Sequence, residues 1–300
     1  MHDISIDQNS PVKKKVIISS GLWFPLIDGL AVYSLFIMRI SPIILVHRPY
    51  NKKKKITLSA RLFYNKKNKY IVLCEYSKKV LIKEYNIAES NITTLPHPNF
   101  KYQYDKIKID HQLKNKLMKW KKNRPIFLYL SGITKDHGIS NLSNIIRKCF
   151  EKKLPYCFLI CGNTRNREQF ILSRTIYKKF ENCENVQCYF NFYSNTQAKT
   201  WLSVSQGVLL PYLEIVQSGV QMLALGQGVP VICQKIGGLS EPVISGWNGI
   251  IVNGKSTAMW IDGMEALLSV TASKAEIIHH AEQKYGAEST CQTITQLLSG

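Results

Sequence analysis

The sequence lacks the features that define several classes of protein. Its eight cysteines are spread over 300 residues, and no two of them form a CxxC pair. This spacing disfavours a disulfide framework or a zinc site and predicts buried free thiols in a reducing compartment. There is also no internal repeat, no low-complexity tract beyond short lysine clusters, and no apparent signal-peptide cleavage site.

The composition is that of a globular protein. The chain is 45% hydrophobic and 20% charged, with 17 glycines and 11 prolines. These proportions exclude a mainly disordered, collagen-like or coiled-coil chain. A length of 300 residues is about twice that of a typical single domain, so two domains are expected.

Acidic residues are scarce, and the imbalance lies in one half. Residues 1–125 contain 25 Lys and Arg against 8 Asp and Glu, whereas residues 126–300 contain 15 against 12. Such asymmetry predicts that the first half faces an anionic partner. Nucleic acid is not the expected partner, because there is no binding motif and the aromatic residues do not alternate with the lysine clusters.

One apolar stretch, residues 16–38, is long enough to cross a bilayer. Pro25, Asp28 and two glycines interrupt it, and a buried aspartate in a membrane costs about 2.5–3.5 kcal/mol. Its first residues, VIIS, also read as a buried strand. We therefore favour a strand followed by an apolar surface segment over a membrane span.

Short apolar runs alternate with segments of helical periodicity along most of the chain. Because the runs do not alternate between polar and apolar residues, they predict strands covered by helices on both faces, as in a doubly wound parallel sheet. The predicted strands are residues 16–19, 42–46, 70–74, 127–131, 157–161, 186–190, 207–211, 230–234 and 249–252.

The segment 207–252 carries the clearest chemical signal. A strand (GVLLP) is followed by a loop that ends in Gln217, Ser218 and Gly219, and then by a short helix that Gly228 terminates. Ser218 is predicted to cap that helix, and Gly219 allows a ligand to approach free backbone amides. A helix start at the carboxyl end of a parallel strand is an anion site suited to a diphosphate. Taken alone, Ser218 could equally be a cap that binds nothing.

A second glycine-rich turn follows the next strand. Gly237 and Gly238 are expected to open another helix at the same edge of the sheet, with Glu241 near its start. Glu241 has two equally good interpretations, a helix-start carboxylate and a donor contact. Two glycine loops at one edge favour a ligand cleft.

The segment 207–252 resembles the donor-binding domain of retaining GT-B glycosyltransferases of the glycosyltransferase-4 family. FLYLSGITKDHGI (127–139) resembles the family's first donor-domain strand and phosphate loop, and PIILVHRPY (42–50) resembles its strand that ends in a site histidine. The resemblance implies a GT-B fold of two Rossmann-like domains, with an abbreviated acceptor-side domain over 1–120 and a donor domain over 121–280. A C-terminal helix over 281–300 is expected to pack back towards the first domain.

The resemblance also implies the activity and its residues. The expected reaction is retaining hexosyl transfer from a nucleotide-diphosphate sugar to a glycan or lipid-linked acceptor in surface polysaccharide synthesis, with no metal or other cofactor. His47 is the candidate catalytic histidine, although a strand-end histidine bonded to backbone is the simpler reading of the residue by itself. His97 is assigned to the crossover between domains. The expected donor-binding residues are Gly132, Lys135, His137, Glu214, Gln217, Ser218, Gly219 and Glu241.

The chain departs from the family pattern in three places. Ile215 and Leu223 stand where the family has two glutamates, Glu214 lies one residue early, and a QSG sequence resembles a known variant of that motif. Ile133 and His137 replace the usual Arg and Lys of the phosphate loop. The first domain is also short. These departures keep a second hypothesis open, a degenerate GT-B protein that acts as a partner or stabilising subunit.

The basic first half suggests where the acceptor is met. Family members that build surface polysaccharides use lipid-linked acceptors at the cytoplasmic leaflet, which is anionic. Each lysine near such a surface contributes about 1 kcal/mol, and Trp23, Phe24 and Leu26 offer an apolar anchor. The expected location is the cytoplasm, peripherally on the inner face of the plasma membrane.

Overall fold

The structure, a computed structural model, describes residues 16–20, 42–49, 63–254 and 256–299. Clustering of the backbone divides it into a first unit, Met1–Leu95 with Leu298–Gly300, and a second unit, Pro96–Leu297. The division lies earlier than the boundary predicted near residue 120. The reason is that helix α5 (His111–Lys121) packs on α8 (Asn195–Val204), and its Leu117 is fully buried in the core of the second unit.

The first unit contains a parallel sheet of four strands in the order β1-β2-β3-β4. Helix α3 (Glu75–Tyr85) packs on β3 and β4, and a short 3-10 helix, η1 (Glu89–Asn91), precedes β4. Buried aliphatic and aromatic side chains, Ile44, Val72 and Leu81 among them, form its core. The strands are β1 (Val16–Ser20), β2 (Pro42–Val46), β3 (Lys69–Val72) and β4 (Ile92–Thr94).

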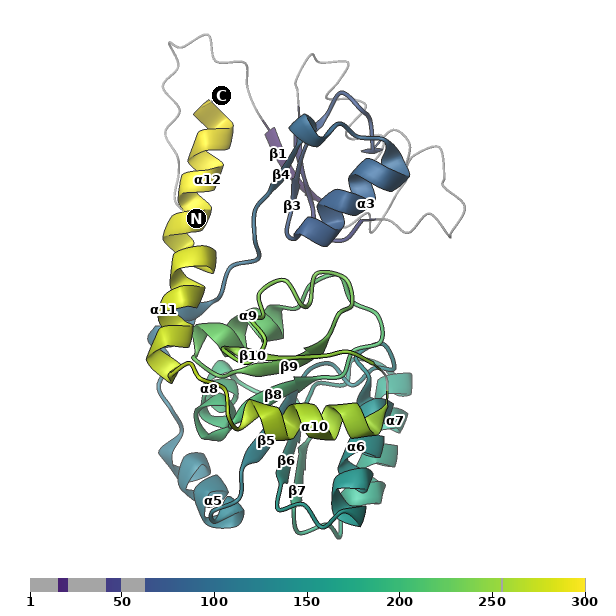
Figure 1. Ribbon diagram of the computed structural model, residues 1–300, viewed down its shortest axis with the longest axis vertical. Helices are drawn as coiled ribbons and strands as arrows, with labels where there is room; N and C mark the ends of the chain where they lie inside the picture. Colours follow the sequence, from purple (N-terminus) through teal and green to yellow (C-terminus); the bar gives the residue numbers. More distant parts are fainter. Residues whose placement is uncertain (1–15, 21–41, 50–62, 255, 300) are drawn as a thin grey trace. The chain divides into compact units, whose positions relative to one another are not determined.

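The second unit is built on a parallel sheet of six strands in the order β10-β9-β8-β5-β6-β7 (Figure 1). Its strands are β5 (Ile126–Leu130), β6 (Cys157–Cys161), β7 (Val186–Tyr189), β8 (Gly207–Leu210), β9 (Val231–Gln234) and β10 (Gly249–Val252). Its other helices are α4 (Lys101–Asp105), α6 (Ile139–Glu151), α7 (Arg167–Phe180), α9 (Gly219–Gly226), α10 (Thr257–Leu267), α11 (Lys274–Tyr285) and α12 (Ala287–Ser299).

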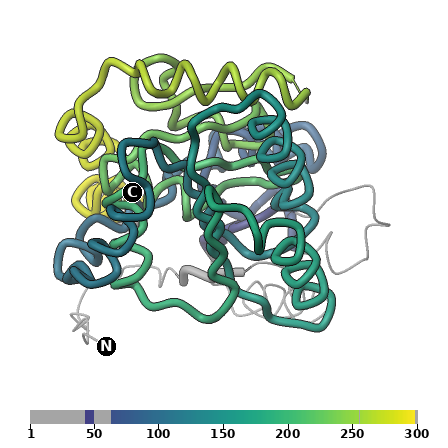
Figure 2. The backbone as a smooth tube through the Cα atoms, turned by 90° about the horizontal axis from the view of Figure 1, so that it is seen from below, coloured from purple at the N-terminus to yellow at the C-terminus, as the bar shows by residue number. Residues whose placement is uncertain are grey.

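Helices cover both faces of this sheet, as Figure 2 shows from another side. Alternate residues of β5 point to opposite faces, since side chains alternate along a strand. Phe127 and Tyr129 join the core under α6, α7 and α10, and Ile126, Leu128 and Leu130 join the core under α8, α9 and α11. Burial on both faces is why the strands are apolar throughout.

All nine predicted strands are present, which confirms the interpretation of the apolar runs. Strand β4 was not predicted, because its sequence, ITT, is too short and polar to stand out. The helix expected after Gly237 and Gly238 is wrong: residues 237–242 form turns. Gly237 has a φ of +55°, which is not a helical conformation. Pro242 follows five residues later and has no backbone N–H to donate, so no run of helical hydrogen bonds forms here.

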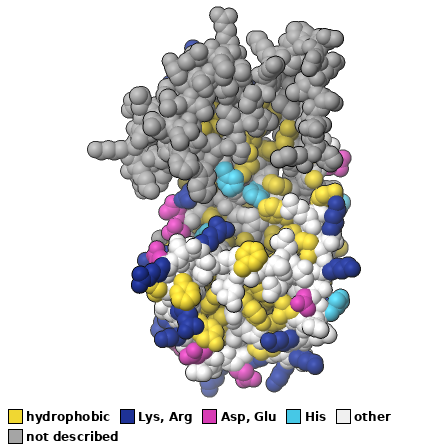
Figure 3. Space-filling model, turned by 180° about the vertical axis from the view of Figure 1, so that it is seen from behind, with side chains coloured by type: hydrophobic (Ala, Val, Ile, Leu, Met, Phe, Trp, Pro, Cys, Tyr) yellow, Lys and Arg dark blue, Asp and Glu magenta, His cyan; other side chains and the backbone are white. Residues whose placement is uncertain are grey.

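Within 16–38, the predicted strand is β1, and residues 21–38, with Trp23, Phe24 and Leu26, lie outside the described residues. The lysine cluster at 52–55 lies outside them as well. No helix in the described part of the chain is both long and apolar enough to span a membrane. The face of the second unit seen in Figure 3 intersperses basic and acidic side chains, in keeping with the near balance of charge in residues 126–300.

The cysteines are free thiols, and five of the eight are buried. Burial raises the pKa of Cys149, Cys188 and Cys233 to about 12, so these thiols are protonated at neutral pH. A protonated, enclosed thiol is a poor nucleophile and a poor metal ligand. The prediction of structural thiols is confirmed for the buried five.

Candidate functional site

The loop that follows β5 is fixed by a close approach to the end of β8. Gly138, the N-cap of α6, has a φ of +70°, and a Cβ atom there would lie 1.7 Å from the carbonyl oxygen of Pro211. Only glycine fits both the backbone conformation and the contact. The loop 131–138 is therefore held against the residues that follow β8.

Hydrogen bonds hold this loop from two sides. The Leu213 amide donates to the Asp136 carbonyl over 2.7 Å, and the Glu214 amide shares that acceptor at 3.4 Å. From the sheet itself, the buried Tyr129 hydroxyl donates to the Gly132 carbonyl at 3.0 Å. Gly132 and Glu214, predicted separately, thus belong to one hydrogen-bonded pair of loops.

Ser218 caps α9 as predicted. Its side chain, 6% exposed, accepts a hydrogen bond from the Gln221 amide at 3.3 Å. Among the described residues, no group accepts a hydrogen bond from the amides of Gly219 or Val220. These amides open the helix, where the backbone dipoles favour an anion. The capping role of Ser218 is confirmed, and diphosphate binding at this helix start stays a prediction.

The segment that enters the second unit crosses α9. A Cβ atom on Gly219 would lie 3.5 Å from the Phe100 ring and 3.7 Å from the His97 ring, and one on Gly226 would lie 2.4 Å from the Asn99 carbonyl oxygen. The His97 Nδ1 atom is 2.9 Å from the Pro98 carbonyl oxygen. Sequence reasoning assigned His97 to the crossover and did not need a ligand contact to explain it. The structure places its ring beside the helix start that we assign to the donor.

A third loop packs on the residues that precede Ser218. The Gly238 amide donates to the Val216 carbonyl at 2.7 Å, and a Cβ atom on Gly237 would lie 2.1 Å from the Ile215 carbonyl oxygen. Residues 213–216, directly before Gln217, therefore contact both the loop after β5 and the loop after β9. Loops after β5, β8 and β9 meet in this way because those strands are neighbours and parallel.

Glu241 stands slightly apart from this contact. It is exposed in the turn after Gly238. The pKa of Tyr285 is raised first by the burial of that tyrosine and second by the negative charge of Glu241. Because residues 237–242 form turns, the helix-start role considered for this carboxylate does not apply.

His137 lies in the loop 131–138, and its side chain is half-buried. Its Nδ1 atom lies 2.8 Å from the Ser131 hydroxyl oxygen and 3.3 Å from the Gly132 carbonyl oxygen. A carbonyl oxygen only accepts, so the proton of the neutral ring is placed on Nδ1. Burial lowers the pKa of His137, and the ring is neutral at pH 7 in the unliganded protein.

Lys135 is committed to an ion pair on the surface. Its ammonium lies 3.2 Å from the Glu168 carboxylate in the first turn of α7, and both side chains are exposed. The pair lines a pocket of about 250 Å³ between the phosphate loop and α7. An exposed pair of this kind contributes under about 1 kcal/mol, so Lys135 can exchange its partner for an anion.

Three side chains that depart from the pattern of the resembled family pack in the hydrophobic core. Ile133 is fully buried in the core under α6, and Leu223, 7% exposed, lies in the opposite core. Ile215 packs against that second core. These three side chains fill space in the fold and do not offer the charged groups that the resembled family has at these positions.

His47 is an exposed residue directly after β2 in the first unit, as the sequence predicts. Its place at a strand end is confirmed, and its catalytic role stays a prediction. Within the described part of the chain, no group of three or more His, Cys, Asp and Glu side chains is arranged to hold a metal ion.

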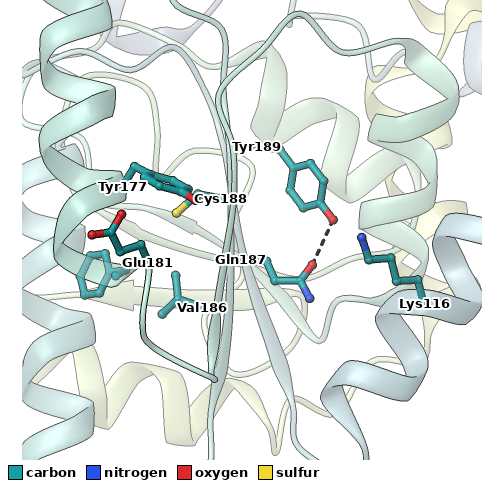
Figure 4. A pocket seen from close by; sticks show the side chains of 8 residues that line it. Lys116, Tyr177, Glu181, Val186, Gln187, Cys188 and Tyr189 are labelled. Carbon is teal, nitrogen blue, oxygen red and sulfur yellow. Dashed lines mark hydrogen bonds between the residues drawn. The ribbon is translucent and has the colours of Figure 1, made fainter.

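A second hollow, of about 290 Å³, lies on the edge strand β7, away from the three loops. Figure 4 shows the side chains of α7 on one side of this strand and Lys116 of α5 on the other. The Tyr189 hydroxyl donates to the Gln187 side chain at 3.0 Å. The residues that line it are Lys116, Tyr177, Phe180, Glu181, Val186, Gln187, Cys188 and Tyr189.

The three loops lie in a segment that matches a known protein family. Residues 124–270 match the family model for glycosyl transferases group 1. The matched segment contains the phosphate loop, Ser218, Gly219 and Glu241. Residues 1–123, with His47 and the basic clusters, lie outside it.

Curated relatives match over shorter stretches. A D-inositol 3-phosphate glycosyltransferase of Pseudarthrobacter chlorophenolicus is 30% identical over 77 residues, which are 26% of this chain and 18% of that protein. The protein of the same name from Corynebacterium diphtheriae is 41% identical over 49 residues, which are 16% of this chain and 12% of that protein. The aligned segment therefore spans less than a fifth of these relatives' length.

Solved structures extend the likeness to the fold of nearly the whole chain. HepE of Anabaena, solved in complex with UDP, has a TM-score of 0.76 at 14% identity, covering 95% of this chain and 78% of its own. Sucrose-phosphate synthase of Thermosynechococcus elongatus has a TM-score of 0.71 at 12% identity, covering 94% and 72%. The fold is that of GT-B glycosyltransferases, which confirms the predicted fold class.

Proposed function

We propose that this protein transfers a hexosyl unit from a nucleotide-diphosphate sugar to a glycan acceptor, with retention of configuration and without a metal ion. The observation that carries the proposal is that the backbone amides of Gly219 and Val220 have no hydrogen-bond acceptor among the described residues. They and the loop at Gly132 lie inside the segment that matches group 1 glycosyl transferases. The structures of HepE with UDP and with UDP-glucose support a nucleotide-sugar donor.

The residues present suit this chemistry. A nucleoside diphosphate leaves with its bonding electrons, so negative charge grows on the phosphate as the glycosidic bond breaks. Fixed amide dipoles at Gly219, Val220 and the Gly132 loop stabilise that charge without reorganising. Lys135, once released from Glu168, supplies a cation beside the loop. His47 is proposed to contact the transferred sugar.

We further propose that the acceptor is lipid-linked, that the product is a surface polysaccharide, and that the protein works in the cytoplasm on an anionic membrane surface. The support is the excess of basic over acidic residues in the first 125 positions, which is not repeated in the rest of the chain. Lysines near anionic lipid favour peripheral docking.

The donor assignment is tested by nucleotide binding. UDP or GDP at about 100 times its Kd should add about 2.7 kcal/mol to the free energy of unfolding, which raises the melting temperature by several degrees. Thermal-shift measurements with UDP, GDP and their sugars, each with and without EDTA, check this. A shift that EDTA removes would contradict metal independence.

The second candidate is a degenerate GT-B protein that acts as a partner or stabilising subunit. It is favoured by Ile133 and Leu223, which are buried where the family has charged side chains. Under this hypothesis no nucleotide or nucleotide sugar raises the melting temperature. The same thermal-shift series therefore decides between the two candidates.

His47→Ala is expected to leave nucleotide binding unchanged within about twofold and to lower the rate of sugar transfer by about 100-fold, the usual range for a proton-transfer or sugar-positioning group. Binding is measured by calorimetry and transfer by release of UDP or GDP. His111→Ala, at the start of α5, is the control. Undiminished turnover in His47→Ala would show that this catalytic assignment is wrong.

A further inference from the structure

A buried tyrosine, Tyr212, joins the two loops that we assign to the donor. It follows β8 directly, and its side chain is 1% exposed. Its hydroxyl donates to the Ser131 hydroxyl oxygen at 3.1 Å. Ser131 opens the phosphate loop and Ser218 caps α9. Tyr212 therefore ties the loop 131–138 to the segment that runs from β8 into α9.

The ring of Tyr212 is held in place from the side. It lies against the imidazole of His137, with ring centroids 4.8 Å apart, and the preceding residue, Pro211, contacts Gly138. His137 is in turn bonded to Ser131. Because Tyr212 is buried and its hydroxyl is bonded to Ser131, its phenolic oxygen is fixed relative to the loop 131–138.

The Tyr212 hydroxyl is the donor in its hydrogen bond to Ser131. Burial raises the pKa of Tyr212, so the phenol keeps its proton and donates it to Ser131. The Ser218 hydroxyl, at the end of the same segment, accepts from the Gln221 amide at 3.3 Å. The Ser131 and Ser218 hydroxyls are thus both hydrogen-bonded within the protein.

We propose that Tyr212 is a positioning residue that sets the spacing between the Gly132 loop and the start of α9, so that both contact the same diphosphate. This inference rests on the proposed function. A diphosphate is short and rigid compared with two independent loops, so its binding depends on their mutual placement. A monophosphate needs only one of the loops.

Tyr212→Phe keeps the ring against His137 and removes only the bridging hydroxyl. We expect the affinity for UDP, or for GDP if the protein prefers it, to fall about tenfold, while the affinity for UMP or GMP changes by less than about twofold. Calorimetric titration of the four nucleotides measures the ratio of diphosphate to monophosphate affinity. A purely structural hydroxyl would weaken both kinds of ligand alike and leave this ratio unchanged.

Two further variants sharpen the test. Tyr189→Phe also removes one phenol, bonded to Gln187 on β7, and should leave the ratio as in the wild type. Ser131→Ala combined with Tyr212→Phe should lose no more diphosphate affinity than the larger single effect, because both break the same link. An unchanged ratio in Tyr212→Phe, with wild-type binding intact, overturns only this role; absence of nucleotide binding in the wild type overturns the proposed function and this inference together.

Discussion

Gly138→Ala is expected to destabilise the second unit by about 3 kcal/mol or more and to abolish nucleotide binding. A Cβ atom at this position would lie 1.7 Å from the Pro211 carbonyl oxygen, a distance no conformational adjustment of the side chain relieves. The φ of +70° adds strain for any residue other than glycine. The loop 131–138 must therefore separate from the end of β8, and the hydrogen bond between Tyr212 and Ser131 breaks with it.

Calorimetric unfolding and nucleotide titration measure the two effects. Gly246→Ala is the matched control, because Gly246 also has a positive φ, +84°, but a Cβ atom there meets nothing within 4 Å. It should cost only the backbone strain, about 1 kcal/mol, and leave binding intact. Equal losses of stability in the two variants would contradict the contact with Pro211.

The sequence was a good guide wherever structure follows from local pattern. Nine apolar runs predicted nine strands, because burial on both faces of a parallel sheet demands such runs. The position of Ser218 at the start of α9 followed from capping chemistry. Where the outcome depends on distant contacts, local pattern is a weaker guide: only the packing of α5 on α8 shows that this helix lies within the second unit.

The candidate site divides in the same way. Gly132, Ser218 and Gly219 were predictable, since loops after neighbouring parallel strands meet at one edge. Tyr212 was not singled out, because a tyrosine after a strand gains its role only from partners far away in the sequence, Ser131 above all. His97 was noticed as a rigid loop residue, and only coordinates place its ring beside Gly219. Residue type suggests chemistry, but partners are assigned by the fold.

Gly219→Val is expected to lower nucleotide affinity by about 100-fold or more while changing the melting temperature little. A first side-chain carbon at Gly219 reaches ordinary contact distance from Phe100 and His97, so a single methyl group fits and larger side chains are expected to crowd those rings. The added methyls of valine must displace those rings or cover the amides of Gly219 and Val220. Either result removes the surface on which the diphosphate is proposed to rest.

Two control variants make the result for Gly219→Val interpretable. Gly219→Ala should stay within about tenfold of the wild type, since its single methyl fits at 3.5 Å from Phe100. Thr257→Val places a valine at the same position of another helix, α10, directly after its serine N-cap, and should leave binding unchanged. If Gly219→Val binds as the wild type does, the open amides of α9 are not the donor's anion site, and the diphosphate must be held by the Gly132 loop without them.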